Sequence, residues 1–220
     1  MTSVVVADDQ DLVRSGLELV LGARGCEVVG LAADGREAVE TVARLEPEVV
    51  LMDIRMPVLD GIAATEQIVA SGSPTRVLVL TTYDLDSYVY RALRAGAAGF
   101  LLKATPPDRL VQGIRTVAAG DALLAPSLTR KLIEEHVRRP PPTNGVPPLL
   151  RELTERELEV FELIAAGAPN NDIAVRLVVS EATVKTHVNR IMAKLDGRTR
   201  AQLVVLAYEC GLVRPGASRR

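Results

Sequence analysis

Cysteine is scarce in this chain of 220 residues, which holds only Cys26 and Cys210, far apart in the sequence. Two cysteines are too few for a disulfide framework or a zinc site, which favours the reducing cytoplasm as the setting. No apolar run approaches the roughly 18 residues of a membrane-spanning helix, so we expect no membrane partner. Asp8, Asp9 and Asp11 interrupt the first apolar run, which argues against a signal peptide.

Charge is divided unevenly along the chain. Residues 1–150 carry 15 Lys and Arg against 19 Asp and Glu, whereas residues 151–220 carry 11 against 9. The small net charge of −2 therefore combines an acidic part with a mildly basic part. Such an asymmetry predicts two domains that have different partners.

Short apolar runs, each followed by a helical pattern, make up most of the acidic part. Buried strands are predicted at residues 3–7, 28–32, 49–53, 77–80 and 98–102. Five successive strand-helix units predict a flavodoxin-like α/β domain with a five-stranded parallel sheet. The expected strand order is 2-1-3-4-5, which puts the second strand at an edge.

Polar residues directly follow four of the five strands. These strand ends carry Asp8-Asp9, Asp53, Thr81 and Lys103. Because the four strands are neighbours in the expected order, their carboxyl ends should share one crevice. Asp53 taken alone could equally cap the next turn, but four converging polar ends favour a phosphoryl site.

Carboxylates brought this close repel one another, and a divalent cation relieves the repulsion. The expected ligands of Mg²⁺ (or Mn²⁺) are Asp8, Asp9, Asp53 and the backbone carbonyl of Arg55. Asp53 would then act as a nucleophile toward a phosphoryl group, whose charge Lys103 neutralises. The hydroxyl of Thr81 would donate a hydrogen bond to the acyl phosphate.

The same residues resemble the signature of a two-component receiver domain. The matching motifs are Asp8-Asp9, Asp53-Ile54-Arg55-Met56-Pro57, Asp60-Gly61, Thr81 and Lys103. The resemblance implies that Asp53 takes phosphate from a sensor histidine kinase, with Thr81 and Phe100 as the switch pair. Phe100 could equally be an ordinary core residue. Ala104 departs from the family pattern, because many receivers have proline there.

Proline is concentrated between the acidic and basic parts, in the stretch Arg138 to Pro148. Proline at this density forbids helix and sheet, so we expect an extended tether. One more short helix is predicted just before it. The expected divisions are a receiver domain at 1–122, a helix and linker at 123–149, a DNA-binding domain at 150–214 and a tail at 215–220.

Four helices are predicted beyond the linker. Thr154 and Glu157 form a capping box for the first, and Asn170, Ser180 and Thr199 are expected to cap the other three. A tight turn joins the second and third, which describes a helix-turn-helix. We therefore expect a small all-α domain of four helices.

The third of these helices carries charge of one sign. Between Thr183 and Arg200 there are five basic residues and one acid, Asp196. Most charged helix faces are merely solvated, but the first helix of this domain is acidic. The segregation favours contact with DNA phosphates.

The basic part resembles the LuxR-type DNA-binding domain, and the whole chain resembles a NarL/FixJ-type response regulator. The motifs are Leu153-Thr154-Glu155-Arg156-Glu157, Ser180-Glu181-Ala182-Thr183-Val184-Lys185-Thr186-His187-Val188 and Lys194-Leu195. The resemblance implies that base edges are faced by Lys185, Thr186 and Asn189, and that phosphates are approached by Thr183, Lys194 and Arg198. Asn171 stands where the family usually has a basic residue. Asn189 replaces a frequent Lys or Arg and can pair with adenine, so we expect a different preferred DNA sequence.

The fourth helix is apolar nearly all round, so one side should face the core and the other a second copy of the chain. The candidate dimer residues are Leu203, Val204 and Val205. A two-fold dimer would read half-sites about one helical turn apart, roughly 10 bp.

The hypothesis is a cytoplasmic, DNA-binding transcription regulator that a sensor kinase switches by phosphorylating Asp53. It is expected to form homodimers on double-stranded DNA and to catalyse only its own phosphoryl uptake and slow loss. One alternative is a phosphohydrolase with an Asp nucleophile, although Arg55 stands where such enzymes carry a second Asp. The other is a constitutive DNA-binding protein with a silent receiver.

Overall fold

The computed structural model of the protein describes residues 1–82, 86–121 and 148–212. Contacts within the chain divide it into two units, Met1–Leu123 and Leu124–Arg220, each with its own hydrophobic core. The short helix expected before the prolines, and nearly all of the proline-rich stretch, lie outside the described residues.

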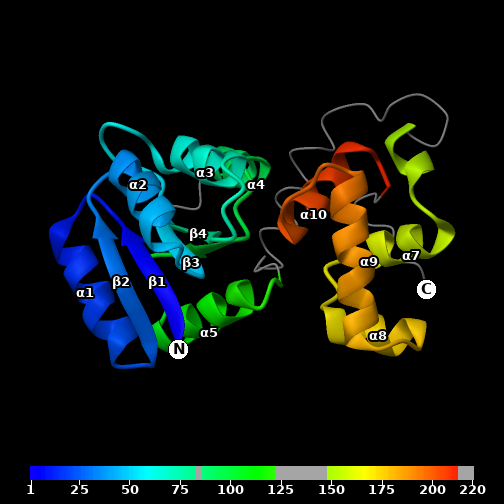
Figure 1. The fold of residues 1–220 in the computed structure, drawn as a ribbon, viewed down its shortest axis with the longest axis horizontal. Coiled ribbons are helices and arrows are strands. Elements are labelled where there is room, and N and C mark those ends of the chain that lie inside the picture. Colours follow the sequence, from blue (N-terminus) through cyan, green and yellow to red (C-terminus); the bar gives the residue numbers. More distant parts are fainter. Residues whose placement is uncertain (83–85, 122–147, 213–220) are drawn as a thin grey trace. The chain divides into compact units, whose positions relative to one another are not determined.

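The first unit alternates strands and helices (Figure 1). Its strands are β1 (Thr2–Ala7), β2 (Cys26–Ala32), β3 (Val49–Asp53), β4 (Arg76–Thr81) and β5 (Gly99–Leu102). Its helices are α1 (Asp11–Gly22), α2 (Gly35–Leu45), α3 (Gly61–Ala70), α4 (Asp86–Arg94) and α5 (Pro107–Ala118). The strands pair in parallel in the order β2-β1-β3-β4-β5, which confirms the predicted flavodoxin-like sheet.

Helices cover both faces of this sheet, with α1 and α5 on one side and α2, α3 and α4 on the other (Figure 1). The central strand β3 is therefore buried along its whole length. Val49 and Leu51 pack into a core cluster with Ile114 of α5. Val50 and Met52 alternate with them and so point to the opposite face, where they are equally buried. This explains why β3 appears in the sequence as an unbroken apolar run that ends in a carboxylate.

Gly61 brings the start of α3 against the end of β3. Its amide donates to the carbonyl oxygen of Ile54 at 2.9 Å. A Cβ atom at this position would lie 1.9 Å from the carbonyl oxygen of Asp53, which no side chain tolerates. Asp60 precedes it as the N-cap and accepts hydrogen bonds from two amides of the first turn. The Asp60-Gly61 pair thus combines a helix cap with a close backbone approach to Asp53.

We expect Gly61→Ala to lower the free energy of unfolding by about 1–3 kcal/mol or more, because the new methyl group forces the backbones of α3 and β3 apart. Gly16→Ala is the matched control. Nothing lies within 4 Å of a Cβ atom at Gly16 inside α1, so alanine should raise stability there by about 0.5–1 kcal/mol. Urea unfolding of both variants measures the difference, and equal effects would contradict the close approach.

The second unit is helical in its described part (Figure 1). A short 3-10 helix, η1 (Pro148–Glu152), precedes α7 (Glu155–Ala165), α8 (Asn170–Leu177), α9 (Glu181–Lys194) and α10 (Arg200–Glu209). All four α-helices contribute to one core, which includes Phe161, Ile164, Ile173, Val184, Val188, Ile191 and Leu203. The prediction of a small four-helix domain is confirmed.

Three of the four predicted helix caps are present. Thr154 and Thr199 each form a capping box, and the side chain of Ser180 accepts a hydrogen bond from the amide of Thr183. The prediction for Asn170 is wrong, because α8 begins at this residue rather than after it. Its side-chain oxygen accepts a hydrogen bond from Arg200 at 2.6 Å, and both side chains are buried. A buried guanidinium needs acceptors, and Asn170 supplies one.

All three candidate dimer residues of α10 are buried in the chain, contrary to the expected exposed surface. Leu203 and Val204 lie in the core of the domain, 0% and 2% exposed. The side of α10 that carries Leu203 and Val204 packs against the other helices of the domain. Val205 is also buried but lies outside that core cluster, and its place in a dimer stays a prediction.

Candidate functional site

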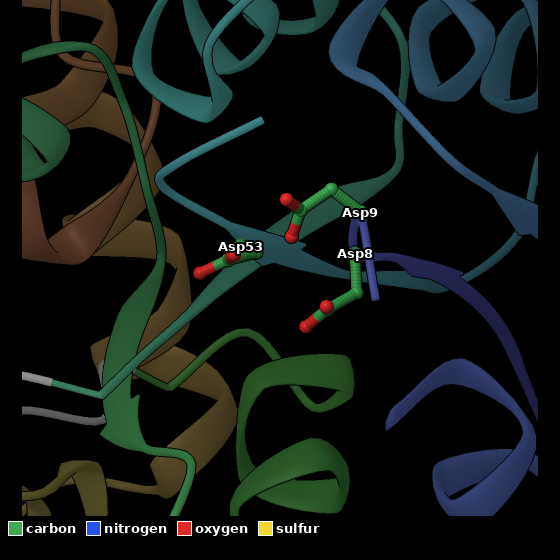
Figure 2. Close-up of side chains that lie close together, drawn as sticks. All are labelled: Asp8, Asp9 and Asp53. Atoms are coloured by element: carbon green, nitrogen blue, oxygen red, sulfur yellow. The ribbon is translucent and has the colours of Figure 1, made fainter. Parts of the chain in front are cut away.

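Three carboxylates gather at the carboxyl edge of the sheet (Figure 2). Asp8 and Asp9 directly follow β1, and Asp53 is the last residue of the neighbouring strand β3. One carboxylate oxygen from each lies within 4.8 Å of the others. Asp8 and Asp53 are buried, whereas Asp9 is exposed. The structure thus brings together the carboxylates that the strand pattern placed in one crevice.

Lys103, which directly follows β5, reaches into this cluster. Its Nζ atom lies 2.5 Å from Oδ2 of Asp8 and 3.0 Å from Oδ2 of Asp53, and the lysine side chain is only 11% exposed. The backbone amide of Lys103 donates to the carbonyl oxygen of Thr81 at 2.7 Å. The ends of β1, β3, β4 and β5 are therefore joined through one lysine.

Burial and charge act differently on the two ion-pair partners. Burial raises the pKa of Asp53, and the negative charge of Asp8 adds to this, although the hydrogen bond and charge of Lys103 and the amide of Ile54 oppose it. For Lys103, burial lowers the pKa, but hydrogen bonds and attraction from two carboxylates outweigh it and leave the pKa raised. One ammonium shared by two carboxylates stays charged, while each carboxylate is only partly compensated. The cluster therefore has room for further positive charge.

Thr81 and Phe100, the predicted switch pair, both lie near this edge. Thr81 ends β4, and Phe100 lies within the adjacent strand β5. Both side chains are buried, at 9% and 5% exposure. Burial suits a core residue and a switch residue equally, so the switch role of Phe100 stays a prediction.

A pocket of about 470 Å³ opens beside the acidic cluster, lined by Asp9, Ile54, Arg55, Met56, Pro57, Asp60 and Tyr88. The guanidinium of Arg55 lies 5.7 Å from the ring centre of Tyr88, a distance suited to a cation–π contact. The sequence offered no signal for this contact, because Tyr88 belongs to α4 and is remote from Arg55 in the chain. The metal-ligand role expected for the Arg55 carbonyl stays a prediction.

Four of the six predicted DNA-contacting residues of the second unit are exposed, three of them on α9. Lys185, Thr186 and Asn189 are exposed and share one side of the helix by their spacing. Arg198, in the turn after α9, is exposed as well. Thr183 is half-buried, and its hydroxyl lies 2.8 Å from that of Ser180.

Two family models match the chain over most of its length. The response regulator receiver domain matches residues 4–115, and the bacterial regulatory proteins of the luxR family match residues 151–207. The chain belongs to the LuxR-type response regulators. It is a DNA-binding transcription regulator with a receiver domain.

This response regulator resembles relatives over nearly its full length. It is 42% identical over 211 residues to the uncharacterized transcriptional regulatory protein YxjL of Bacillus subtilis, covering 96% of both chains. It is 40% identical over 209 residues to the oxygen regulatory protein NreC of Staphylococcus carnosus, covering 94% of this chain and 96% of that one. The solved structure of the response regulator ChrA, from a heme-sensing two-component system, shares 33% identity with a TM-score of 0.52, covering 96% and 98% of the two chains.

The donor set of the receiver pocket fits a hard divalent cation, the kind of ion that receiver domains generally bind there. Mg²⁺ prefers oxygen ligands and keeps several of its waters, which an exposed Asp9 beside two buried carboxylates permits. Such a cation would compensate the buried carboxylate of Asp53, whose pKa is raised. None of the helices in the described ranges has the length and hydrophobicity needed to cross a membrane.

Lys194 occupies a different position from the other predicted DNA-contacting residues. Its Nζ atom lies 2.6 Å from Oε2 of Glu157 on α7, and the Glu157 side chain is only 4% exposed. The nearest partner of this lysine is therefore a carboxylate of its own domain. The pair ties α9 to the capping box at the start of α7. Contact of Lys194 with a DNA phosphate stays a prediction.

Glu157 predicts a specific acid sensitivity. Its pKa is lowered from 4.5 to about 2, because Lys194 and the amide of Thr154 bind the charged carboxylate. A group whose pKa is lower in the folded state stabilises the fold above its unfolded-state pKa. That contribution should be lost as the pH falls from about 4.5 toward 2.

We expect Glu157→Gln to lower the free energy of unfolding at neutral pH by about 1–3 kcal/mol and to flatten its decline in acid. Glu159→Gln is the control, because Glu159 pairs with Arg156 at 2.7 Å while 54% of its side chain is exposed, and such pairs contribute little. Amide hydrogen exchange in α7 and α9 across this pH range measures both variants. If the stability of Glu157→Gln declined in acid as steeply as that of wild type, Glu157 would not be the source of the acid sensitivity.

Proposed function

We propose that a sensor histidine kinase phosphorylates Asp53 and thereby switches how this regulator binds DNA. The observation that supports this most directly is the position of Lys103, within 2.5 and 3.0 Å of the Asp8 and Asp53 carboxylates. That position is suited to binding an oxygen of an incoming phosphoryl group. Asp53 lies beside it as the nucleophile.

In the proposed transfer, an oxygen of Asp53 attacks the phosphorus of a phosphohistidine. The phosphorus–nitrogen bond breaks, its electrons return to the imidazole, and an aspartyl phosphate forms. Lys103 holds a phosphoryl oxygen, and the Thr81 hydroxyl donates to the product. Mg²⁺ held by Asp8, Asp9 and Asp53 would supply charge neutralisation on the phosphoryl oxygens. The chain acts as an acceptor that loses its phosphate slowly, rather than as an enzyme with turnover.

Replacing Asp53 should abolish phosphoryl uptake. Asp53→Asn keeps the shape of the side chain but removes the nucleophilic carboxylate. We expect no mass increase with acetyl phosphate and Mg²⁺, whereas the wild-type chain gains one phosphoryl group. Asp108→Asn, which changes an exposed carboxylate of α5, should label normally. Equal labelling of Asp53→Asn and wild type would contradict the assignment of Asp53 as the phosphoryl acceptor. Steady hydrolysis of phosphate monoesters would instead favour a phosphohydrolase.

The proposed output is binding of double-stranded DNA through α9, by homodimers on two-fold sites in the cytoplasm. Exposure of Lys185, Thr186 and Asn189 on one side of α9 supports this, since a recognition helix offers such a side to the major groove. Phosphorylation is proposed to shift a two-state receiver toward the form that dimerises. A footprint that forms equally without phosphodonor would instead favour a constitutive DNA-binding protein.

Lys185→Ala should weaken binding to the specific DNA site about tenfold or more, because a base-edge contact is worth about 1–3 kcal/mol. Discrimination against a mutated site should fall as well. Arg151→Ala is the control, since it removes an exposed positive charge from η1, outside α9. Titration of both variants with operator and scrambled DNA at fixed salt measures the effect. If the two variants lose affinity equally, the contribution of Lys185 is general charge rather than recognition.

A further inference from the structure

Arg14, near the start of α1, reaches back to the acidic cluster. Its Nη1 donates to the backbone carbonyl oxygen of Asp8 at 2.6 Å, and its Nη2 donates to Oδ1 of Asp11 at 2.9 Å. Only 13% of the Arg14 side chain is exposed, whereas 89% of the Asp11 side chain is. The guanidinium thus lies against the turn between β1 and α1, and two of its nitrogens donate to two acceptors, the Asp8 carbonyl and the Asp11 carboxylate.

The other bonds of this turn run through Asp8, whose carboxylate also pairs with Lys103, and through Gln10. Gln10 is the N-cap of α1, but its side chain caps nothing. Its amide instead donates to Oδ1 of Asp8 at 3.0 Å, and the amide of Asp8 donates to Ala32 at 3.1 Å. The turn that carries both acidic residues is therefore anchored through Asp8, and Arg14 supplies the bond to its carbonyl.

The carbonyl that Arg14 holds belongs to the peptide plane between Asp8 and Asp9. Because this plane is rigid, fixing its oxygen fixes one backbone torsion of each residue. Together with the side-chain torsions, these backbone torsions set the directions of both carboxylates. Arg14 also pairs with the exposed carboxylate of Asp11, and we assign the effect of Arg14 on the cluster to its hold on this peptide plane.

We propose that Arg14 is a positioning residue that holds Asp8 and Asp9 in the arrangement that binds Mg²⁺, an inference that rests on the metal-dependent phosphoryl uptake proposed above. Groups that orient metal ligands without touching the metal typically contribute 10- to 100-fold to affinity. Arg14→Ala should therefore weaken Mg²⁺ binding about tenfold.

Three further variants separate this role from general stabilisation. Arg14→Lys keeps one donor but lacks the fork, so its affinity should fall between those of Arg14→Ala and wild type. Asp11→Ala leaves the Asp8 carbonyl bond in place and should cost less than Arg14→Ala. Arg24→Ala is the matched control, because Arg24 also bonds a carboxylate and a carbonyl, Asp108 at 2.9 Å and Val20 at 3.4 Å, beyond the opposite end of α1. It should bind Mg²⁺ like wild type.

Binding is measured on the full chain by calorimetry with Mg²⁺ and by electron paramagnetic resonance with Mn²⁺. Urea unfolding without metal is measured in parallel. The phosphoryl uptake of Arg14→Ala should need about tenfold more Mg²⁺ for half its maximal rate, with the maximal rate nearly kept. A merely structural role would lower metal-free stability and leave Mg²⁺ affinity unchanged in the folded variants.

Wild-type Mg²⁺ affinity in folded Arg14→Ala would overturn the inference, and so would equal losses in Arg14→Ala and Arg24→Ala. If Arg14→Ala does not fold, the Mg²⁺ affinities of Arg14→Lys and Asp11→Ala relative to wild type test the inference. If Asp53→Asn still takes up phosphate, the acceptor assignment fails while the role of Arg14 is still judged by Mg²⁺ binding. A wild-type chain that binds no Mg²⁺ would refute both.

Discussion

The ammonium of Lys103 lies against two buried carboxylates, and the receiver site depends on that contact. Asp8 is 1% and Asp53 is 6% exposed, and a buried charge without a partner costs several kcal/mol. The partners come from three different strands, which meet only because the sheet is parallel and all carboxyl ends lie at one edge. β4 completes the edge, since its last carbonyl, that of Thr81, binds the Lys103 amide.

A second buried carboxylate, Glu157, shows why Asp53 is suited to chemistry. Lys194 at 2.6 Å and the backbone amide of Thr154 at 2.8 Å both bind the Glu157 carboxylate and lower its pKa to about 2. Its charge is satisfied, and it links two helices. Asp53 shares its lysine with Asp8, and burial raises its pKa. The first environment makes a structural ion pair, and the second leaves a carboxylate that a cation or a phosphoryl group can still engage.

The sequence was sufficient to predict features set by local pattern and strand order. The sequence predicts that Asp8, Asp53 and Lys103 meet because each stands at the carboxyl end of an apolar run, and in a parallel sheet these ends share an edge. Asn170 was mistaken for a cap because its residue type favours capping, while its actual partner, a buried arginine, is remote in sequence. Leu203 was mistaken for a surface residue because an all-round apolar helix carries no periodicity to distinguish core from interface. Both errors arise where a tertiary partner decides the role of a residue.

The two lysines of α9 show how such partners assign function within one helix. Lys185 faces Glu181 at 3.5 Å with about half of each side chain exposed, an arrangement worth about 0–1 kcal/mol. A DNA phosphate or base can replace that carboxylate at little cost. Lys194 is paired with a carboxylate that is 4% exposed, and removing the lysine would leave a buried charge uncompensated. The burial of the acid, rather than the charge of the base, therefore separates a lysine whose ion pair is easily exchanged from one that ties two helices together.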